Sequence, residues 1–252
     1  MSNILVSIDP ATGKELKKYK VHDEKYVEKA LKNSVSTFDE WRKLPFSKRA
    51  SVLKNIAKEL RQQKDALVKL AAKEMGKPMA QGHYEVEKCA STLEFYAKNG
   101  AQFLADEVVA TDARKSYVSF QPLGTVLAIM PWNFPYWQVF RAFAPTVMAG
   151  NVMLLKHASN VSGCALAIEK LILKAGAPKG LLQTLLIPSS RVEGLIDDSR
   201  VAAVTLTGST DAGRKVAAVA GRNLKKAVLE LGGSDPYVIL EDADMNTAVE
   251  IA

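Results

Sequence analysis

The sequence predicts an α/β fold in which helices cover both faces of a parallel sheet, and a helical amino-terminal segment precedes that sheet. Two observations support this prediction. Residues 23–105 carry apolar side chains at helical spacing, and beyond residue 123 short apolar runs alternate with amphipathic stretches. Continuous apolar strands of this kind are typical of parallel sheets buried on both faces. With 252 residues, 48% of them apolar, the chain can bury a sizeable core.

The amino-terminal part is expected to begin with two short strands and to continue as helices. Residues 4–21 carry a Pro- and Gly-containing turn between two strand-like runs. One helix begins at residue 23, and a second begins at Ser47 and ends at Gly76-Lys77-Pro78. A third helix covers residues 79–104.

The second part of the chain is expected to form the sheet. A separate strand is predicted first, from the alternating residues 116–120. The sheet strands are predicted at 126–130, 152–156, 182–187, 203–207 and 227–230. Helices are predicted between them at 137–148, 161–175, 190–197 and 210–222. One more strand, 237–240, and the start of a helix follow.

The composition argues against several classes of protein. The net charge of +7 comes without a run of five or more lysines, so we expect no nucleic-acid partner. No apolar stretch is long enough to span a membrane, and the first residues do not resemble a secretory signal. Two cysteines, Cys89 and Cys164, do not make a disulfide framework, so a reducing cytoplasm is the expected location. His157 has no second histidine at a ligand spacing, so no metal is expected.

Four of the predicted strands are followed by loops with unusual residues. Parallel strands bind ligands beyond their carboxyl ends, so the four loops are expected to meet at one edge of the sheet. The loops contain Asn133 in Pro131-Trp132-Asn133-Phe134-Pro135, Lys156 before His157-Ala158-Ser159, the run Gly208-Ser209-Thr210, and Glu230 before Leu231-Gly232-Gly233.

Each loop has a functional interpretation and a purely structural alternative. The amide of Asn133 can donate to a developing oxyanion, or it can satisfy its own turn. Lys156 can bind a hydroxyl or a phosphate, or extend to water. Glycine and hydroxyls before a helix at 208–210 favour an anion site, although Thr210 can simply cap that helix. Glu230 can deprotonate a water or a thiol, or it can be a solvated carboxylate.

Taken together, the four motifs resemble the aldehyde dehydrogenase superfamily over the whole chain, and most closely its NAD(P)-dependent succinate-semialdehyde dehydrogenases. The resemblance implies a Rossmann-like cofactor domain, with Asn133 as oxyanion donor and Glu230 as the base that activates water. It also implies a set of cofactor contacts: Trp132, Asn133, Lys156, His157, Ala158 and Ser159 near the adenosine ribose and its loop, Gly208 and Ser209 at the pyrophosphate, and Leu231 at the nicotinamide.

Two residues refine the expected cofactor and substrate. Relatives that use NAD often carry a glutamate where this chain has Ser159, and a carboxylate there would repel a 2′-phosphate. We therefore expect NADP as the cofactor, with NAD possible. Arg141 stands where relatives that act on succinate semialdehyde carry arginine, and a guanidinium can bind the distal carboxylate of that aldehyde. The alternative for Arg141 is an ion pair with a nearby acid.

The resemblance also implies domains and a missing part. Residues 1–231 are expected to form the cofactor domain, interrupted by an oligomerisation strand at about 107–122, and 232–252 to begin a catalytic domain. The family's nucleophilic cysteine follows the glutamate, and none follows Glu230 here. We therefore expect an amino-terminal half, inactive alone, of an enzyme that is a homo-oligomer when full length. The alternatives are an acyl-phosphate or acyl-CoA-linked reductase and a catalytically silent paralogue that binds nucleotide or partners full-length subunits.

Overall fold

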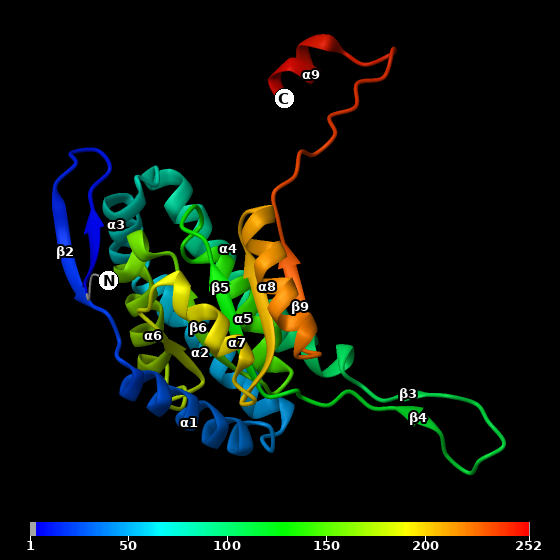
Figure 1. Cartoon of the computed structure of the whole chain (residues 1–252). Helices are drawn as coiled ribbons and strands as arrows, with labels where there is room; N and C mark the ends of the chain where they lie inside the picture. The colour runs from blue at the N-terminus through cyan, green and yellow to red at the C-terminus, as the bar shows by residue number, and fades with distance from the viewer. Residues whose placement is uncertain (1–3, 252) are drawn as a thin grey trace.

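Figure 1 shows the computed structural model of the chain, which describes residues 4–251. Residues 1–3 and 252, the outer ends of the two predicted domains, lie outside the described residues. The amino-terminal part begins with an antiparallel hairpin of β1 (Ile4–Ile8) and β2 (Glu15–Lys20). The helices α1 (Glu24–Trp41), α2 (Phe46–Gln62), α3 (Lys64–Met75) and α4 (Met79–Phe103) follow.

A five-stranded parallel sheet forms the centre of the molecule, with the strand order β7-β6-β5-β8-β9. The strands are β5 (Thr125–Met130), β6 (Val152–His157), β7 (Leu182–Thr184), β8 (Val201–Thr207) and β9 (Lys226–Glu230). The connecting helices are α5 (Trp137–Met148), α6 (Ser162–Lys174), α7 (Val192–Asp197) and α8 (Thr210–Arg222). Short 3₁₀ turns at Ser159–Val161 and Ser189–Arg191 precede α6 and α7.

Helices cover both faces of this sheet, which confirms the predicted α/β fold class. Helices α2 to α6 pack on one face, and α1, α7 and α8 pack on the other (Figure 1). Strand β5 supplies side chains to both: Ala128 belongs to the first core and Leu127 to the second. Successive strand residues point to opposite faces, so the unbroken apolar sequence of β5 and β6 is what a sheet covered on both sides requires.

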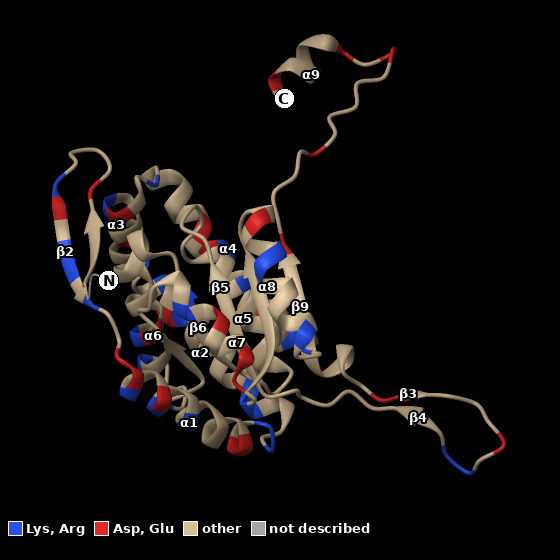
Figure 2. Cartoon of the chain, in the orientation of Figure 1, with Lys and Arg blue, Asp and Glu red and all other residues tan. Residues whose placement is uncertain are grey.

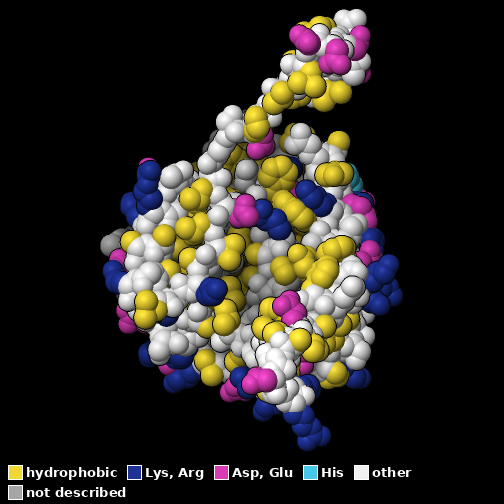
Figure 3. All heavy atoms as spheres, turned by 90° about the vertical axis from the view of Figure 1, so that its right-hand side faces the viewer, with side chains coloured by type: hydrophobic (Ala, Val, Ile, Leu, Met, Phe, Trp, Pro, Cys, Tyr) yellow, Lys and Arg dark blue, Asp and Glu magenta, His cyan; other side chains and the backbone are white. Residues whose placement is uncertain are grey.

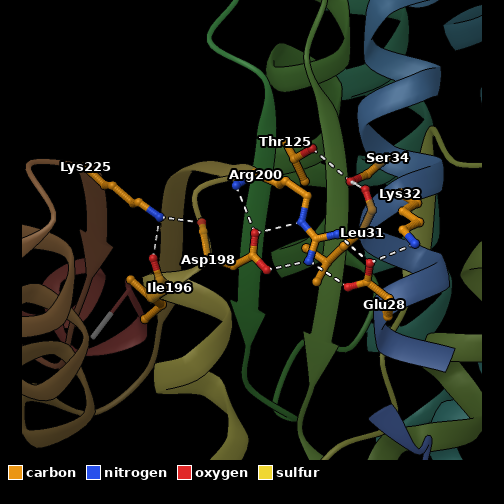
Figure 4. Close-up of polar contacts among 9 residues, drawn as sticks. All are labelled: Glu28, Leu31, Lys32, Ser34, Thr125, Ile196, Asp198, Arg200 and Lys225. Carbon is orange, nitrogen blue, oxygen red and sulfur yellow. Dashed lines mark hydrogen bonds and ion pairs between the residues drawn. The ribbon is translucent and has the colours of Figure 1, made fainter. Parts of the chain in front are cut away.

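An ion-pair network fastens α1 to the edge of the sheet where the strands begin (Figure 4). The guanidinium of Arg200, just before β8, pairs with Asp198 at 2.6 Å and with Glu28 of α1 at 2.8 Å. Lys225 donates to the carbonyl oxygens of Ile196 and Asp198 in the same region. These contacts lie at the opposite end of the strands from the predicted site, so they support the scaffold.

Two segments extend away from the sheet and its helices. A long hairpin carries the two-residue strands β3 (Glu107–Val108) and β4 (Tyr117–Val118), and the chain after β9 leads to α9 (Met245–Ile251) (Figure 1). Lys, Arg, Asp and Glu residues are distributed along the helices and the hairpins, with both signs intermixed (Figure 2). None of the described helices combines the length and the apolar character that crossing a bilayer requires.

Several details differ from the sequence predictions. The strand expected at 116–120 covers only Tyr117–Val118. The helix expected from Ser47 to Gly76 is two helices, because the backbone of Gln63 leaves helical geometry (φ −101°, ψ 9°) between α2 and α3. The strand expected at 182–187 ends at Thr184. The strand expected at 237–240 is absent from the described residues: this run pairs with no strand, and Val238 is 75% exposed. Apolar sequence alone predicted a strand there, but a strand also needs a neighbour to bond.

Candidate active site at the carboxyl edge of the sheet

A cleft of about 490 Å³ lies at the carboxyl ends of β5, β8 and β9. Strand register places its walls side by side, since Thr207 of β8 pairs with Glu230 of β9. The cleft brings together seven of the predicted site residues: Trp132, Asn133, Arg141, Gly208, Ser209, Glu230 and Leu231. Three of the four predicted loops therefore meet in one place, as the rule for parallel sheets requires.

Asn133 presents a free amide to this cleft. It is exposed, and among the described residues its side chain forms no hydrogen bond, so it does not satisfy its own turn. Two buried side chains bind the backbone around Asn133: the Asn133 carbonyl accepts from Lys77 Nζ at 2.7 Å, and the Pro135 carbonyl lies 2.9 Å from His157 Nε2. A fixed backbone with an unpaired amide suits a group that donates to a ligand.

Arg141 and Glu230 form an ion pair within the cleft. Arg141 lies on α5, and its Nη1 is 3.4 Å from Glu230 Oε2, while its Nη2 donates to Thr207 Oγ1 at 3.0 Å. Both side chains keep contact with water, at 33% and 54% exposed. The pair matches the alternative considered for Arg141, an ion pair with a nearby acid, yet it also sets a cation and a carboxylate side by side beside Asn133.

The loop after β8 opens helix α8 toward the same cleft. Ser209 is the N-cap of α8 and accepts from the Ala212 N–H at 3.2 Å, so the cap is Ser209 and not Thr210. A Cβ added at Gly208 would meet nothing closer than 3.7 Å, so the space beside it is open. Open backbone at a helix N-terminus is where anionic groups such as phosphates bind.

Lys156 lines a second, neighbouring cleft of about 240 Å³. Apolar side chains form most of its walls: Ile129, Val192, Ile196, Leu206, Ala212, Val216 and Val219. Lys156 as a whole is 8% exposed, and its ammonium donates to Ser189 Oγ at 3.2 Å. Burial lowers the pKa of Lys156, and no carboxylate among the described residues pairs with it. A buried ammonium beside an apolar slot suits the hydroxyls or phosphate of a nucleotide whose base fills the slot.

The rest of the Lys156 loop lines neither cleft. His157 is buried, Ala158 is half-buried and Ser159 is exposed at the start of its 3₁₀ turn. The His157 ring nitrogen Nδ1 accepts from the Ala158 N–H at 2.9 Å, so Nε2 carries the proton that Pro135 accepts. Burial lowers the pKa of His157 to about 4, which keeps the ring neutral. Within residues 4–251, no group of His, Cys, Asp and Glu side chains is arranged to hold a metal ion.

Sequence reasoning missed several residues of the two clefts. Gln138 lines the first, and Ser189, Ser190 and Lys215 line the second. Ser189 and Ser190 follow Pro188 just beyond the β7 segment, so the rule about carboxyl ends could have identified them. Lys215 lies on α8 without a local signal, and only the packing of α8 places it there.

The comparisons with known proteins decide the family. The model of the aldehyde dehydrogenase family matches residues 2–252. The chain belongs to the aldehyde dehydrogenase family. A probable succinate-semialdehyde dehydrogenase [NADP(+)] of Synechocystis is 49% identical over 98% of this chain and 55% of that protein. A succinate semialdehyde dehydrogenase [NAD(P)+] of Escherichia coli is 44% identical over 98% of this chain and 54% of that protein.

Solved structures of aldehyde dehydrogenases agree with this assignment. The succinic semialdehyde dehydrogenase from Streptococcus pyogenes, in complex with NADP+, superposes with a TM-score of 0.94 and 37% identity, over 98% of this chain and 54% of that one. The chain spans about half the length of the curated relatives it matches, 55% of the Synechocystis protein. The predicted fold and the predicted family are thus both confirmed.

Proposed function

We propose that this chain is the cofactor-binding part of an enzyme that oxidises succinate semialdehyde to the dicarboxylic acid with NADP, and with NAD as a possible second cofactor. One observation carries the proposal: Asn133, Arg141, Glu230 and the Gly208–Ser209 turn line a single cleft. The names of the Synechocystis and Escherichia coli relatives support the choice of aldehyde and of cofactor.

The two clefts together suit an extended dinucleotide. The apolar slot around Val216 takes the adenine, Lys156 binds the ribose side, and the N-terminus of α8 receives the pyrophosphate. The nicotinamide end then reaches the first cleft beside Leu231. Ser159 lines neither cleft, but it follows Lys156 closely in the chain and brings no negative charge that would repel a 2′-phosphate. When bound, the cofactor supplies the hydride acceptor.

The residues of the first cleft have complementary roles in this chemistry. The Asn133 amide donates to the oxygen that gains charge when a thiol adds to the aldehyde. Glu230 takes a proton from the water that later releases the acid. Arg141 binds the distal carboxylate of the substrate, and it leaves Glu230 when that carboxylate arrives. The exchange of one carboxylate for another keeps the guanidinium paired throughout.

The attacking thiol is neither of the cysteines in this chain. Cys89 and Cys164 are both buried and lie away from the two clefts. Burial raises the pKa of each thiol far above its usual value, which suppresses the reactive thiolate. We therefore propose that the chain by itself binds cofactor without turning over aldehyde. Unpaired cysteines also support a reducing, cytoplasmic location.

The proposed domain division assigns a role to the extended segments. Residues 1–231 form the cofactor domain, the hairpin at about 107–122 joins subunits of a homo-oligomer, and 232–252 begin the catalytic domain. Val108 is 81% exposed on that hairpin, and Val228 of β9 is 60% exposed. Apolar side chains spread over the β9 side of the molecule (Figure 3), which suits a surface that packs against further protein.

A full-length form that contains this chain tests the proposal directly. The full-length form is expected to reduce NADP to NADPH with succinate semialdehyde. The 252-residue chain is expected to bind NADP but to produce no NADPH. Glu230→Gln in the full-length form is expected to trap the thioester, seen as a burst of NADPH followed by slow turnover. A full-length form that binds NADP but oxidises no aldehyde contradicts the proposal and favours a silent nucleotide-binding protein.

A further inference from the structure

A buried ion pair lies directly beneath the loop that presents Asn133. Lys77 follows the left-handed C-cap Gly76 of α3, and Glu85 lies on α4. Lys77 Nζ is 3.5 Å from Glu85 Oε2, and the two side chains are only 4% and 1% exposed. Neither residue lines the two clefts. The pair therefore serves something other than direct contact with a ligand.

Both members of the pair bind backbone groups of one short loop. Glu85 Oε1 accepts from the N–H groups of Tyr136 and Trp137, each at 2.8 Å, at the start of α5. Lys77 Nζ donates to the Asn133 carbonyl at 2.7 Å and lies 3.3 Å from the centre of the Phe134 ring. The loop is thus held on both sides of Phe134 and Pro135, with the Asn133 amide at its tip.

The energetics of buried ions make a purely stabilising role a poor account of this pair. Removing two charges from water costs about as much as their attraction returns, and apolar replacements of similar shape are often neutral in stability. Glu85 Oε2 has no hydrogen-bond partner among the described residues, and burial raises the pKa of its carboxyl group despite Lys77 and the two N–H donors. What the pair supplies is direction: the Glu85 carboxylate accepts from two backbone N–H groups of the loop, and the Lys77 ammonium donates to one backbone carbonyl of the same loop.

We propose that Lys77 and Glu85 are positioning residues that fix the Asn133 loop, so that the Asn133 amide points at the oxygen that gains charge during aldehyde oxidation. The inference rests on the proposed function of Asn133. It assigns roles to two residues of the helical segment, which contributes no side chain to either cleft. The Lys77 ammonium binds the backbone carbonyl of Asn133, and the side-chain amide of the same residue is the proposed oxyanion donor. A displacement of Lys77 therefore displaces that amide directly.

Steady-state kinetics of a full-length form in two backgrounds test this role. Lys77→Met and Glu85→Gln are expected to lower kcat for succinate semialdehyde by about 10- to 100-fold, since small misplacements of catalytic groups have effects of this size. The dissociation constant of NADP is expected to stay within about twofold. In an Asn133→Ala background, the same substitutions are expected to lower kcat no further, because the group they position is gone. Equal losses in both backgrounds would overturn the proposal.

Amide hydrogen exchange on the 252-residue chain separates this inference from the proposed function. The N–H groups of Tyr136 and Trp137 are expected to exchange at least about tenfold faster in Glu85→Gln, with exchange in β6 unchanged. The matched control is Lys64→Met, which breaks a more exposed ion pair between Lys64 of α3 and Glu87 of α4 and leaves the loop alone. Unchanged exchange at Tyr136 and Trp137 overturns the restraint. If the wild-type full-length form has no activity, the proposed function is wrong instead. The exchange rates of Tyr136 and Trp137 still show whether Glu85 restrains the Asn133 loop.

Discussion

The guanidinium of Arg141 lies 3.4 Å from the carboxylate of Glu230 and hydrogen-bonds Thr207 at 3.0 Å. The predicted substrate-binding cation and the predicted base are therefore partners in this structure. An ion pair that keeps contact with water contributes little to stability, about 0–1 kcal/mol. The pair can thus open readily when another carboxylate competes for the arginine.

Arg141→Ala in a full-length form is expected to raise KM for succinate semialdehyde by about 10- to 100-fold, the range for losing a charge-assisted hydrogen bond. KM for an uncharged aldehyde of similar length is expected to change by less than about threefold, because no distal carboxylate is present. Steady-state kinetics with both substrates measure this difference. Arg214→Ala removes an exposed arginine that pairs with Asp211 on α8, and serves as the control. Equal KM changes for both aldehydes would remove Arg141 from the substrate site.

Ser159→Glu is expected to shift cofactor preference from NADP toward NAD by roughly tenfold or more, because the new carboxylate repels a 2′-phosphate. Titration of the chain with each cofactor measures the shift. Ser159→Ala is the control, since it removes the hydroxyl without adding charge, and it should change the ratio much less. If wild type already rejects NADP, or if both variants behave alike, the role of Ser159 in selecting the cofactor is wrong.

Because His157 is neutral in the folded chain, the free energy of unfolding is expected to depend on pH. Its pKa in the folded chain is about 4, below the usual value of 6.5, so between these values the unfolded chain binds a proton that the folded chain does not. Stability is therefore full above pH 6.5 and is lost as pH falls toward 4, by up to about 3 kcal/mol. Urea unfolding at several pH values should show this loss shrinking in His157→Gln. An identical pH slope in both proteins would contradict it.

Two glycines of α8 make a matched pair for testing how closely the helix approaches the site. A Cβ on Gly213 would lie 2.5 Å from Leu231 Cδ2, whereas one on Gly221 would meet nothing within 4 Å. Gly221→Ala is expected to stabilise the chain by about 0.5–1 kcal/mol through helix propensity. Gly213→Ala is expected to be less stable than Gly221→Ala by about 1–3 kcal/mol, because Leu231 must move. Urea unfolding compares the two, and equal stabilities would show that Leu231 does not pack there.

The sequence predicted best what depends on local pattern. The alternation of apolar strands and amphipathic helices located α5 and α8 at the residues where they occur, 137–148 and 210–222. The loops at Asn133, Gly208 and Glu230 could be placed in one cleft because the carboxyl ends of parallel strands share an edge. None of these features depends on a contact between distant side chains.

What the sequence did not predict depends on tertiary packing. Arg141 and Glu230 are 89 positions apart and meet only because α5 and β9 flank the same cleft. Lys77 and Glu85 lie in a segment that reads as ordinary helix and turn, and only packing carries them beneath the Asn133 loop. The break between α2 and α3 at Gln63 has no glycine or proline that would predict it from the sequence.

Calorimetric titration of the 252-residue chain with NADP measures whether the two clefts form a dinucleotide site. We expect one NADP to bind per chain with a micromolar to submillimolar dissociation constant. Lys156→Met is expected to weaken this binding about tenfold or more, because a charge-assisted hydrogen bond is lost. Lys170→Met, which removes an exposed lysine of α6, should bind like wild type. No heat of binding, or equal affinity in the Lys156→Met and Lys170→Met variants, would contradict the claim that these loops form a dinucleotide site.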